Sequence, residues 1–486
     1  MKGIAALLST LLLAVGGVFI TGCATDADRA ADRGDGPHFP FPQRAFGQFA
    51  VAPTMPSVKT QAEMEDMIVH LLREILRNDL IVDSGSPPTR EEFRMALRHF
   101  QAWEVIEGGQ LVSHITTSEA HGYGMLMLAY MAGSEERLGF SPDEWIFGSA
   151  SLKDYFDAML RTVLEFPSSS SSLFTWRLLG YEDLDQEGVT QGGYRVVNGV
   201  KTAPFTRDAS FGNSTTDGDM DIIYALILAD RQWGSSGRHD YIGIARRMLA
   251  DLWAYCVHGQ YHFLLLGDWV YASGSPIHMN AARTSSLMLS HLRAFMDVDP
   301  AHNWQAVIDA SHNIIRDIRG AQNNLGRVNG LLPDFVVRGA AGWEVPWGNL
   351  VAYFGDVFGF DAVRVPWRLG ASYMLFGNAA IGDSTLHDLI IGPLDDLARA
   401  FPGGFNAFGP MRMDGSSFGA APNWFAPPFA VTAAARADQQ WVDSFWAYTP
   451  GSGNPFQGLN AYLGDTHGDY IRLIVLLAIT GNYWIP

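Results

Sequence analysis

The most restrictive feature of this 486-residue sequence is a set of helical segments that differ in how much of their surface is apolar. Residues 218–233 are the clearest case, because the stretch from Ile222 to Ala229 has almost no polar side chain. A helix of this kind is buried on all sides. Residues 240–257 instead alternate charged and apolar positions at helical spacing, as a half-exposed helix does. The two types together indicate an inner ring of helices wrapped by an outer ring.

Apolar residues at steps of three and four predict helices throughout the body of the chain. The predicted segments are 58–76, 90–104, 118–133, 150–165, 218–233, 240–257, 282–296, 303–318, 366–376, 383–400, 438–447 and 468–480. Strand signals are sparse, and residues 194–200 are the best hairpin candidate. The connections between helices are long, and ordered connections of this size are usually functional. They lie at 166–215, 259–281, 319–365 and 401–437.

The first segment predicts export. Met1-Lys2 is followed by an apolar run from Ile4 to Ile20, and the sequence Ile20-Thr21-Gly22-Cys23 resembles a bacterial lipobox. We expect a signal peptide at 1–22 and lipidation of Cys23, with an ordinary signal peptide or an anchor helix as alternatives. Two or more acyl chains would anchor the protein stably to a membrane.

Residues 23–56 are rich in Ala, Asp, Arg, Gly and Pro, which predicts a flexible tether. Residues 57–486 show no second linker and no repeat, so we expect one helical domain. The signal and tether together predict an exported bacterial lipoprotein of the cell envelope, at the outer membrane or cell surface, and we expect it to be a monomer.

Composition excludes several classes of protein. Hydrophobic residues make up 48% and charged residues 17%, which is not the composition of a disordered chain. The net charge of −18 disfavours nucleic acid and anionic polysaccharides as partners. Two cysteines form neither a disulfide framework nor a cysteine zinc site. His258 and His262 have a spacing that permits a metal, but no third ligand is evident, so we expect no metal and no cofactor.

A glutamate begins one of the apolar helices. In Thr117-Ser118-Glu119-Ala120-His121-Gly122-Tyr123, the acid stands where the chain becomes wholly apolar. It is either a first-turn glutamate favoured by the helix dipole, with Ser118 as the cap, or a functional carboxyl group. In the functional interpretation, burial at the mouth of an apolar barrel raises its pKa, as a general acid requires.

Three aspartates precede the next apolar helix. Asp217, Asp219 and Asp221 are close enough to raise one another's pKa unless something is bound or paired there. Their spacing also begins an EF-hand loop, but the glycine and glutamate that such a loop needs are Ile222 and Leu228 here. The remaining interpretations are a solvated helix cap and a functional acidic cluster.

A third acidic position is followed by an arginine and a proline. Asp361 and Arg364 can face one another in a turn, and Pro366 suits the first turn of the helix that follows. An arginine beside an aspartate lowers the pKa of the acid and keeps it charged, as a general base requires. A buried structural ion pair is the alternative.

These three segments, in this order, resemble the motifs of glycoside hydrolase family 8. The family shows a SEGxGYGM-type motif, an A-[ST]-D-G-D-x-D-I-A helix start and a YDAxRxPWR motif. Further similar pieces are 173–176, 266–269 and 330–334, and the resemblance extends from about residue 60 to 480. Departures include Ala120 for Gly, Ile223 for Ala, and Phe360 without the usual hydroxyl. Residues 283–286 (Arg-Thr-Ser-Ser) replace a Ser-Tyr pair whose tyrosine helps to position the attacking water in many members.

The resemblance implies an all-α (α/α)6 barrel, with its long loops forming a substrate groove, and inverting hydrolysis of β-1,4-linked glycans. Glu119 would be the general acid and Asp361 the general base. Asp217 would bind and distort the sugar at the cleaved bond, with Asp219 close by, and Arg364 would hold Asp361 ionised. Inversion requires carboxyl groups about 6.5–9.5 Å apart with opposite protonation states.

Aromatic side chains would complete the groove by stacking on sugar faces, although core packing is an alternative for each of them. The candidates are Tyr123, Trp176, Trp269, Trp347 and Trp367. We expect an endo-β-1,4-glucanase that acts on a β-glucan, with xylan or chitosan as alternative substrates. Two other classes of protein fit the sequence less well. The three retained carboxylates argue against a non-catalytic surface glycan-binding lipoprotein, and the negative charge argues against a lyase that binds uronates.

Overall fold

The structure is a computed structural model, and it describes residues 36–99, 105–107, 110–181, 187–190, 193–346, 355–401, 408–419, 425–446, 464 and 466–486. The predicted signal peptide, Cys23 and Trp347 lie outside the described residues. Within the described ranges, none of the helices combines the length and apolar character that spanning a bilayer would need.

Six helices form a closed inner ring. They are α3 (Ser118–Tyr130), α6 (Thr216–Trp233), α9 (Leu289–Val298), α11 (Val365–Phe376), α13 (Phe429–Ala435) and α15 (Thr466–Ile479). Each contacts the next in this order, and α15 contacts α3, which closes the ring. The apolar stretch around Ile222 is buried all round within this ring, as its sequence predicted.

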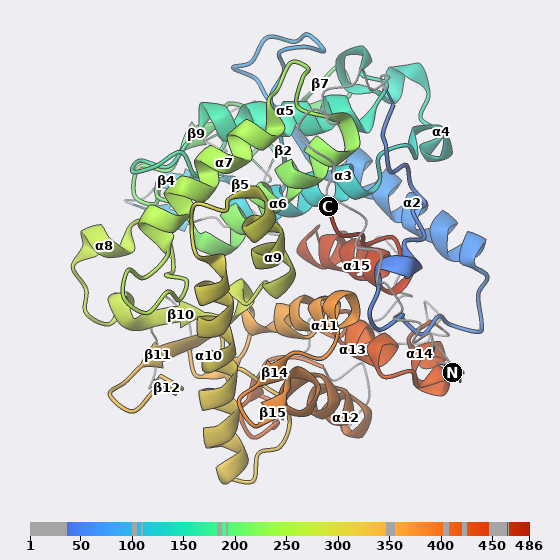
Figure 1. Cartoon of the computed structure of the whole chain (residues 1–486). Helices are drawn as coiled ribbons and strands as arrows, with labels where there is room; N and C mark the ends of the chain where they lie inside the picture. Colours follow the sequence, from blue (N-terminus) through green and yellow to red (C-terminus); the bar gives the residue numbers. More distant parts are fainter. Residues whose placement is uncertain are drawn as a thin grey trace, which may run out of the picture. The chain divides into compact units, whose positions relative to one another are not determined.

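Six helices that are longer than a single turn lie outside the ring. They are α2 (Gln61–Asp79), α5 (Leu152–Glu165), α7 (Tyr241–Asp251), α10 (Trp304–Asn324), α12 (Gly392–Ala400) and α14 (Gln439–Trp446). Each precedes one inner helix in the chain and lies against the ring (Figure 1). Each buries one face and exposes its polar face. This alternation of outer and inner helices is the predicted (α/α)6 barrel.

Short strands hold the connections that enter the inner helices. Strand β5 (His114–Thr117) leads directly into α3 and pairs with β6 (Arg177–Leu179), which also pairs with β9 (Thr206–Arg207). Strand β10 (Ala281–Arg283) precedes α9 and pairs with β11 (Phe335–Arg338), which is followed by β12 (Trp343–Glu344). Strand β13 (Val357–Phe358), which pairs with β16 (Met411–Arg412), precedes α11. The strands thus lie where the chain enters the barrel.

A fourth sheet corrects one helix prediction and confirms the hairpin. Strands β7 (Arg195–Val197) and β8 (Val200–Ala203) form the hairpin expected at 194–200. The helix predicted at 90–104 is wrong where the structure describes it, because β2 (Met95–Leu97) pairs with β1 (Leu80–Asp83). Pairing with a neighbouring strand satisfies the backbone of this short apolar stretch, which periodicity alone cannot distinguish from a helix.

The segment just before the barrel is folded, although we expected it to belong to the tether. Phe41 is buried, and its N–H donates to the carbonyl of Ala132 over 2.7 Å. Arg44 forms an ion pair of 2.6 Å with the buried Glu65, and Val51 donates to the carbonyl of Met374. The predicted tether is therefore wrong for residues 36–56, whose few apolar side chains suffice to cover helix ends.

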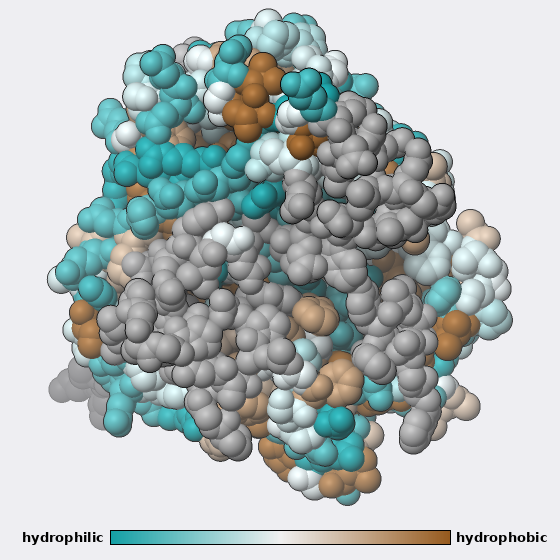
Figure 2. All heavy atoms as spheres, turned by 180° about the vertical axis from the view of Figure 1, so that it is seen from behind, coloured by the Kyte–Doolittle hydropathy of each residue, from teal (hydrophilic) through white to brown (hydrophobic). Residues whose placement is uncertain are grey.

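Figure 2 shows one face, on which hydrophilic side chains predominate in the upper part and apolar residues form small separate patches. This distribution fits a chain whose large apolar residues form one continuous core.

Candidate active site

Two glycines allow α3 and α6 to approach closely. A Cβ on Gly218 would lie 2.7 Å from the backbone nitrogen of Glu119, and a Cβ on Gly122 would lie 2.7 Å from Cβ of Asp221. Both distances are shorter than side chains tolerate, so glycine is required at each position. The close approach places Glu119 and Asp217, which are 98 positions apart in the sequence, at neighbouring helix ends.

The predicted functional residues lie at the N-terminal ends of inner helices. Glu119 and Asp217 are in the first turns of α3 and α6, and Asp361 precedes the turn that leads into α11. The cap of α3 is Thr117, whose hydroxyl accepts from Ala120 N–H, and not Ser118 as we expected. Helix N-termini carry partial positive charge, which favours carboxylates. One end of the barrel therefore gathers acidic residues from three distant parts of the chain.

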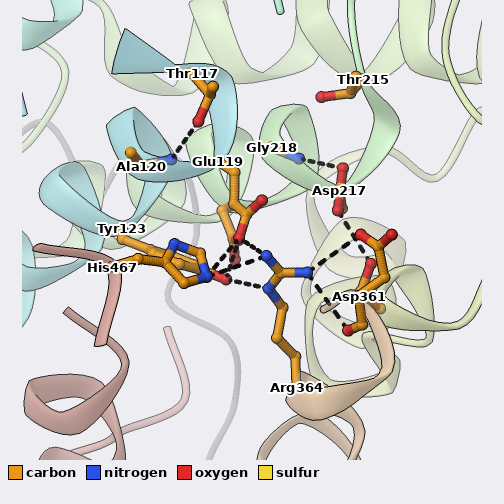
Figure 3. A network of polar contacts seen from close by, with 12 residues as sticks. Thr117, Glu119, Ala120, Tyr123, Thr215, Asp217, Gly218, Asp361, Arg364 and His467 are labelled. Atoms are coloured by element: carbon orange, nitrogen blue, oxygen red, sulfur yellow. Dashed lines mark hydrogen bonds and ion pairs between the residues drawn. The ribbon is translucent and has the colours of Figure 1, made fainter. Parts of the chain in front are cut away.

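Arg364 lies between the predicted acid and the predicted base (Figure 3). Its Nη2 forms an ion pair with Glu119 Oε1, and its Nη1 is 3.3 Å from Asp361 Oδ1. The Arg364 side chain is 5% exposed, whereas those of Glu119 and Asp361 are 18% and 22% exposed. Both carboxylates are thus accessible to solvent, and one buried guanidinium keeps them from direct contact.

The two oxygens of each carboxylate have different surroundings. Glu119 Oε1 accepts from the hydroxyl of Tyr123 over 3.1 Å as well as from Arg364, and Asp361 Oδ1 faces Arg364 and Arg283. Within the described ranges, nothing donates to Glu119 Oε2 or Asp361 Oδ2. These two oxygens are therefore the ones available for a proton and for a water molecule.

Asp217 is held more tightly than the other two acids. It accepts from Arg283 Nη1 over 2.9 Å, from the Ser285 hydroxyl over 3.0 Å and from Gly218 N–H over 3.2 Å. Burial by itself would raise the pKa of Asp217, but the guanidiniums of Arg283 and Arg364 outweigh it and lower the pKa. Asp217 is therefore a fixed anion.

Glu119 has the opposite character. Burial raises its pKa to about 7, and the charges of Asp217 and Asp361 act in the same direction, while Arg364 and Tyr123 oppose the rise. Three carboxylates face two guanidiniums at this site, which leaves one negative charge without a partner. A proton on Glu119 removes that charge, so Glu119 can hold a proton at a pH where Asp217 is ionised.

Asp334 organises the backbone around Asp361. Its Oδ1 accepts from the N–H groups of Gly359, Asp361 and Ala362, over 2.9, 3.1 and 2.7 Å. Burial and repulsion from Asp361 raise the pKa of Asp334, although these donors oppose the rise. The carboxylate thus fixes the turn that presents Asp361.

Three predicted substrate contacts are buried instead. Tyr123 and Trp367 are 0% exposed and pack against each other with ring centroids 5.7 Å apart. Tyr123 therefore contacts Glu119 and Arg364, and Trp367 is a core residue. Asp219 is also 0% exposed and accepts from Phe174 N–H over 2.8 Å, and burial raises its pKa well above the usual range. It supports the segment before Trp176 and does not face the site.

Two of the remaining aromatic candidates are still suitable for stacking. Trp176 is half-buried, and its carbonyl accepts from Ser118 N–H over 2.6 Å, which places it next to Glu119. Trp269 is half-buried and packs edge-on against His278, with ring centroids 5.0 Å apart. Trp347 lies outside the described residues, so its role stays a prediction.

Sequence reasoning missed His467, at the start of α15. Its Nε2 accepts from Arg364 Nη2 over 3.2 Å and lies 3.5 Å from Glu119 Oε1. Burial, together with the nearby Arg364, lowers the pKa of His467 well below its usual range, so its ring is neutral. The sequence of α15 could have indicated this residue, because the helix begins with polar residues and then becomes apolar, as α3 and α6 do.

Arg283 and Asp334 were noted as parts of segments but were not assigned to the site. Both lie in the connection before an inner helix, which is where Asp361 also lies. Among the described residues, no group of three or more histidines, cysteines or acidic residues has a geometry that could hold a metal ion.

Comparisons with known proteins agree with this geometry. The family described as "Glycosyl hydrolases family 8" matches residues 198–379, which include Asp217, Asp361 and Arg364. A β-glucanase of Niallia circulans is 29% identical over 374 residues, covering 76% of this chain and 77% of the relative. An endoglucanase of Bacillus sp. strain KSM-330 is 26% identical, covering 76% of this chain and 68% of the relative. The family match and these relatives together support glycoside hydrolase family 8 for this chain.

Solved structures support the fold of this glycoside hydrolase. The apo structure of a β-1,3-1,4-glucanase from Paenibacillus sp. X4 has a TM-score of 0.70 at 26% identity, covering 93% of this chain and 100% of that chain. Rex8A from Paenibacillus barcinonensis, complexed with xylose, has a TM-score of 0.59 at 14% identity, covering 89% and 97%. The second likeness concerns the fold alone.

Proposed function

We propose that this glycoside hydrolase cleaves β-1,4 bonds of a β-glucan with inversion at the anomeric carbon. The observation that carries the proposal is the pair of partly exposed carboxylates, Glu119 and Asp361, on two sides of the buried Arg364. A sugar on the exposed side reaches both acids at once. In an inverting reaction one acid protonates the leaving oxygen while the other activates water on the opposite face of the ring.

The local chemistry assigns the roles. Glu119, with its pKa raised to about 7, carries the proton on Oε2 and gives it to the glycosidic oxygen. Asp361 faces two guanidiniums through its Oδ1, and its Oδ2 accepts a proton from the attacking water. Asp217 stays charged and binds sugar hydroxyls or the developing oxocarbenium charge from its fixed position.

β-Glucan is supported as the substrate by the relatives and by the charge of the site. The β-glucanase and endoglucanase named above align over three quarters of the chain. Half-buried Trp176, beside Glu119, offers a flat face to a neutral sugar. Xylan and chitosan are the comparison substrates that any assay has to include.

The first experiment measures reducing-sugar release from mixed-linkage glucan, carboxymethyl cellulose, xylan and chitosan, and follows the product anomer by NMR. We expect glucan cleavage with inversion, and a loss of about 10²–10⁴-fold in turnover for Glu119→Gln. Glu91→Gln, at an exposed position of the same residue type, is the matched control and should keep full activity. An active Glu119→Gln enzyme or a retained anomer would contradict the mechanism, and binding without release would favour a glycan-binding protein.

We also propose that the enzyme is an exported lipoprotein, acylated at Cys23 and attached to the cell envelope as a monomer. The support is the apolar run from Ile4 to Ile20 and the lipobox-like residues that end at Cys23. Labelling with a palmitate analogue and membrane fractionation test the proposal. Cys23→Ala should remove the label and release the enzyme from membranes, and an unlabelled wild-type precursor would refute the acylation. Size-exclusion chromatography of the enzyme lacking residues 1–22 tests the monomer.

A further inference from the structure

Arg283 joins two of the three acids at the site. It ends strand β10, and its Nη1 is 2.9 Å from Asp217 Oδ1 while its Nε is 3.5 Å from Asp361 Oδ1. Its guanidinium also lies over the ring of Phe335, 5.4 Å from the centroid. The side chain is 17% exposed, so it is fixed by its contacts and still borders the exposed side of the site.

The two arginines leave the site with little spare negative charge. Arg364 connects Glu119 to Asp361, and Arg283 connects Asp361 to Asp217, so acids and cations alternate. With a proton on Glu119, the two ionised aspartates are balanced by the two guanidiniums. A neutral sugar enters such a site without charge repulsion, but a sugar ammonium group meets two fixed cations and no unpaired carboxylate.

We propose that Arg283 is a positioning and specificity-determining residue that holds Asp361 against Asp217 and selects neutral glycans over cationic ones such as chitosan. The inference rests on the proposed function, because it concerns the sugar bound between Glu119 and Asp361. It also gives a role to the residues that stand where many family members have a Ser-Tyr pair. Arg283 pairs with Asp217 from one side, and Ser285 of the same segment donates to its other oxygen.

The positioning role has its own signature in the pH profile. Asp361 is faced by Arg364 from its own turn, by Arg283 from β10, and by Asp334, which lies beneath its backbone N–H. Removing the Arg283 charge leaves the like charge of Asp217 less opposed. We therefore expect the acidic limb of kcat/KM to move to higher pH when this charge is removed.

The experiment compares wild type with Arg283→Gln, Arg283→Lys and Arg316→Gln. Arg316 is 50% exposed and pairs with Asp317 on α10, so its substitution is the matched loss of one charge away from the site. The readouts are glucan kcat and KM against pH, and inhibition of glucan cleavage by neutral cello-oligosaccharides and by glucosamine oligomers on the acidic side of neutrality. Thermal unfolding of each variant shows whether it is folded.

In wild type we expect glucosamine oligomers to inhibit at least tenfold more weakly than neutral oligomers of equal length, equivalent to ~1.4 kcal/mol. Arg283→Gln should remove this difference, lower kcat more than it raises KM, and shift the acidic limb upward. Arg283→Lys keeps the charge but cannot contact both acids in the same way, so it should keep the discrimination and lose turnover. Arg316→Gln should match wild type.

Failure of this inference can be distinguished from failure of the proposed function. If wild type does not cleave glucan, the proposed function is wrong. If wild type cleaves glucan but binds or cleaves the cationic oligomers equally well, the role of Arg283 in specificity is refuted. If Arg283→Gln is unfolded, the test uses the folded Arg283→Lys variant. Loss of its discrimination between neutral and cationic oligomers would also refute the role of Arg283 in specificity. An acidic limb that stays in place in both folded variants would refute the positioning role.

Discussion

Replacing Tyr123 with phenylalanine tests how the acidity of Glu119 is set. The Tyr123 ring is 0% exposed and packs edge-on against Trp367, so phenylalanine fits the same space. Only the hydroxyl is removed. That hydroxyl donates to Glu119 Oε1 over 3.1 Å and accepts from Arg364 Nε over 2.9 Å.

The magnitude follows from these two contacts. A net contribution of about 1 kcal/mol for the hydrogen bond to ionised Glu119 corresponds to about 0.7 pKa unit. The bond favours the charged carboxylate, so its loss raises the pKa of Glu119 above the value of about 7 in wild type. Arg364 Nε also loses its acceptor in a buried place, and we expect the free energy of unfolding to fall by about 1–3 kcal/mol.

The assay is the pH dependence of kcat/KM on a soluble β-glucan. A general acid works in its protonated form, so activity is lost as the pH rises through the pKa of Glu119. The basic limb of Tyr123→Phe should therefore lie about half to one pH unit above that of wild type, even if the maximal rate is lower.

Tyr130→Phe is the matched control. Tyr130 lies on the same helix, is also 0% exposed, and donates to the carbonyl of Trp484 away from Glu119. Its loss should lower stability and leave the basic limb unmoved. A limb that stays in place or moves to lower pH in Tyr123→Phe, or one that moves equally in Tyr130→Phe, would refute the reasoning.

Two further predictions concern the packing and the charge of the site. Gly218→Ala should lower the free energy of unfolding by about 1–3 kcal/mol, because the added methyl group overpacks the contact, and should reduce kcat by separating α3 from α6. The control is Gly237→Ala, at an exposed position where no atom lies near the added Cβ. It should change neither the unfolding free energy nor kcat, as measured by circular-dichroism melts and turnover assays. Folded Glu119 binds its proton more tightly than unfolded Glu119 between pH 4.5 and about 7, so stability falls as the pH rises through this window. The glutamine in Glu119→Gln cannot titrate. Between pH 4.5 and about 7, the unfolding free energy of wild type should therefore fall by about 3 kcal/mol relative to that of Glu119→Gln, as measured by urea unfolding. If the two curves of unfolding free energy against pH are parallel, Glu119 is not the group responsible.

Much of the fold could be predicted because apolar periodicity reports burial directly. The stretch from Ile222 to Ala229 had no polar face, and it lies inside the ring. The strand at Met95–Leu97 could not be predicted in the same way, because a short apolar stretch fits both a helix and a strand until its partner, Leu80–Val82, is known. The tether prediction was wrong for residues 36–56 for a similar reason. The composition of this segment does not show which surface Phe41 packs against.

The sequence by itself determined which residue types stand at the starts of the apolar helices, because an acidic residue directly before an apolar stretch can be recognised without the structure. It identified Glu119, Asp217, Asp361 and Arg364. Only the tertiary structure decided how these groups share their charges. Pairings such as Arg283 with Asp217, or His467 with Arg364, depend on separate helix ends meeting at one end of the barrel. The protonation of each acid follows from those neighbours and from burial, and neither exists before the ring closes.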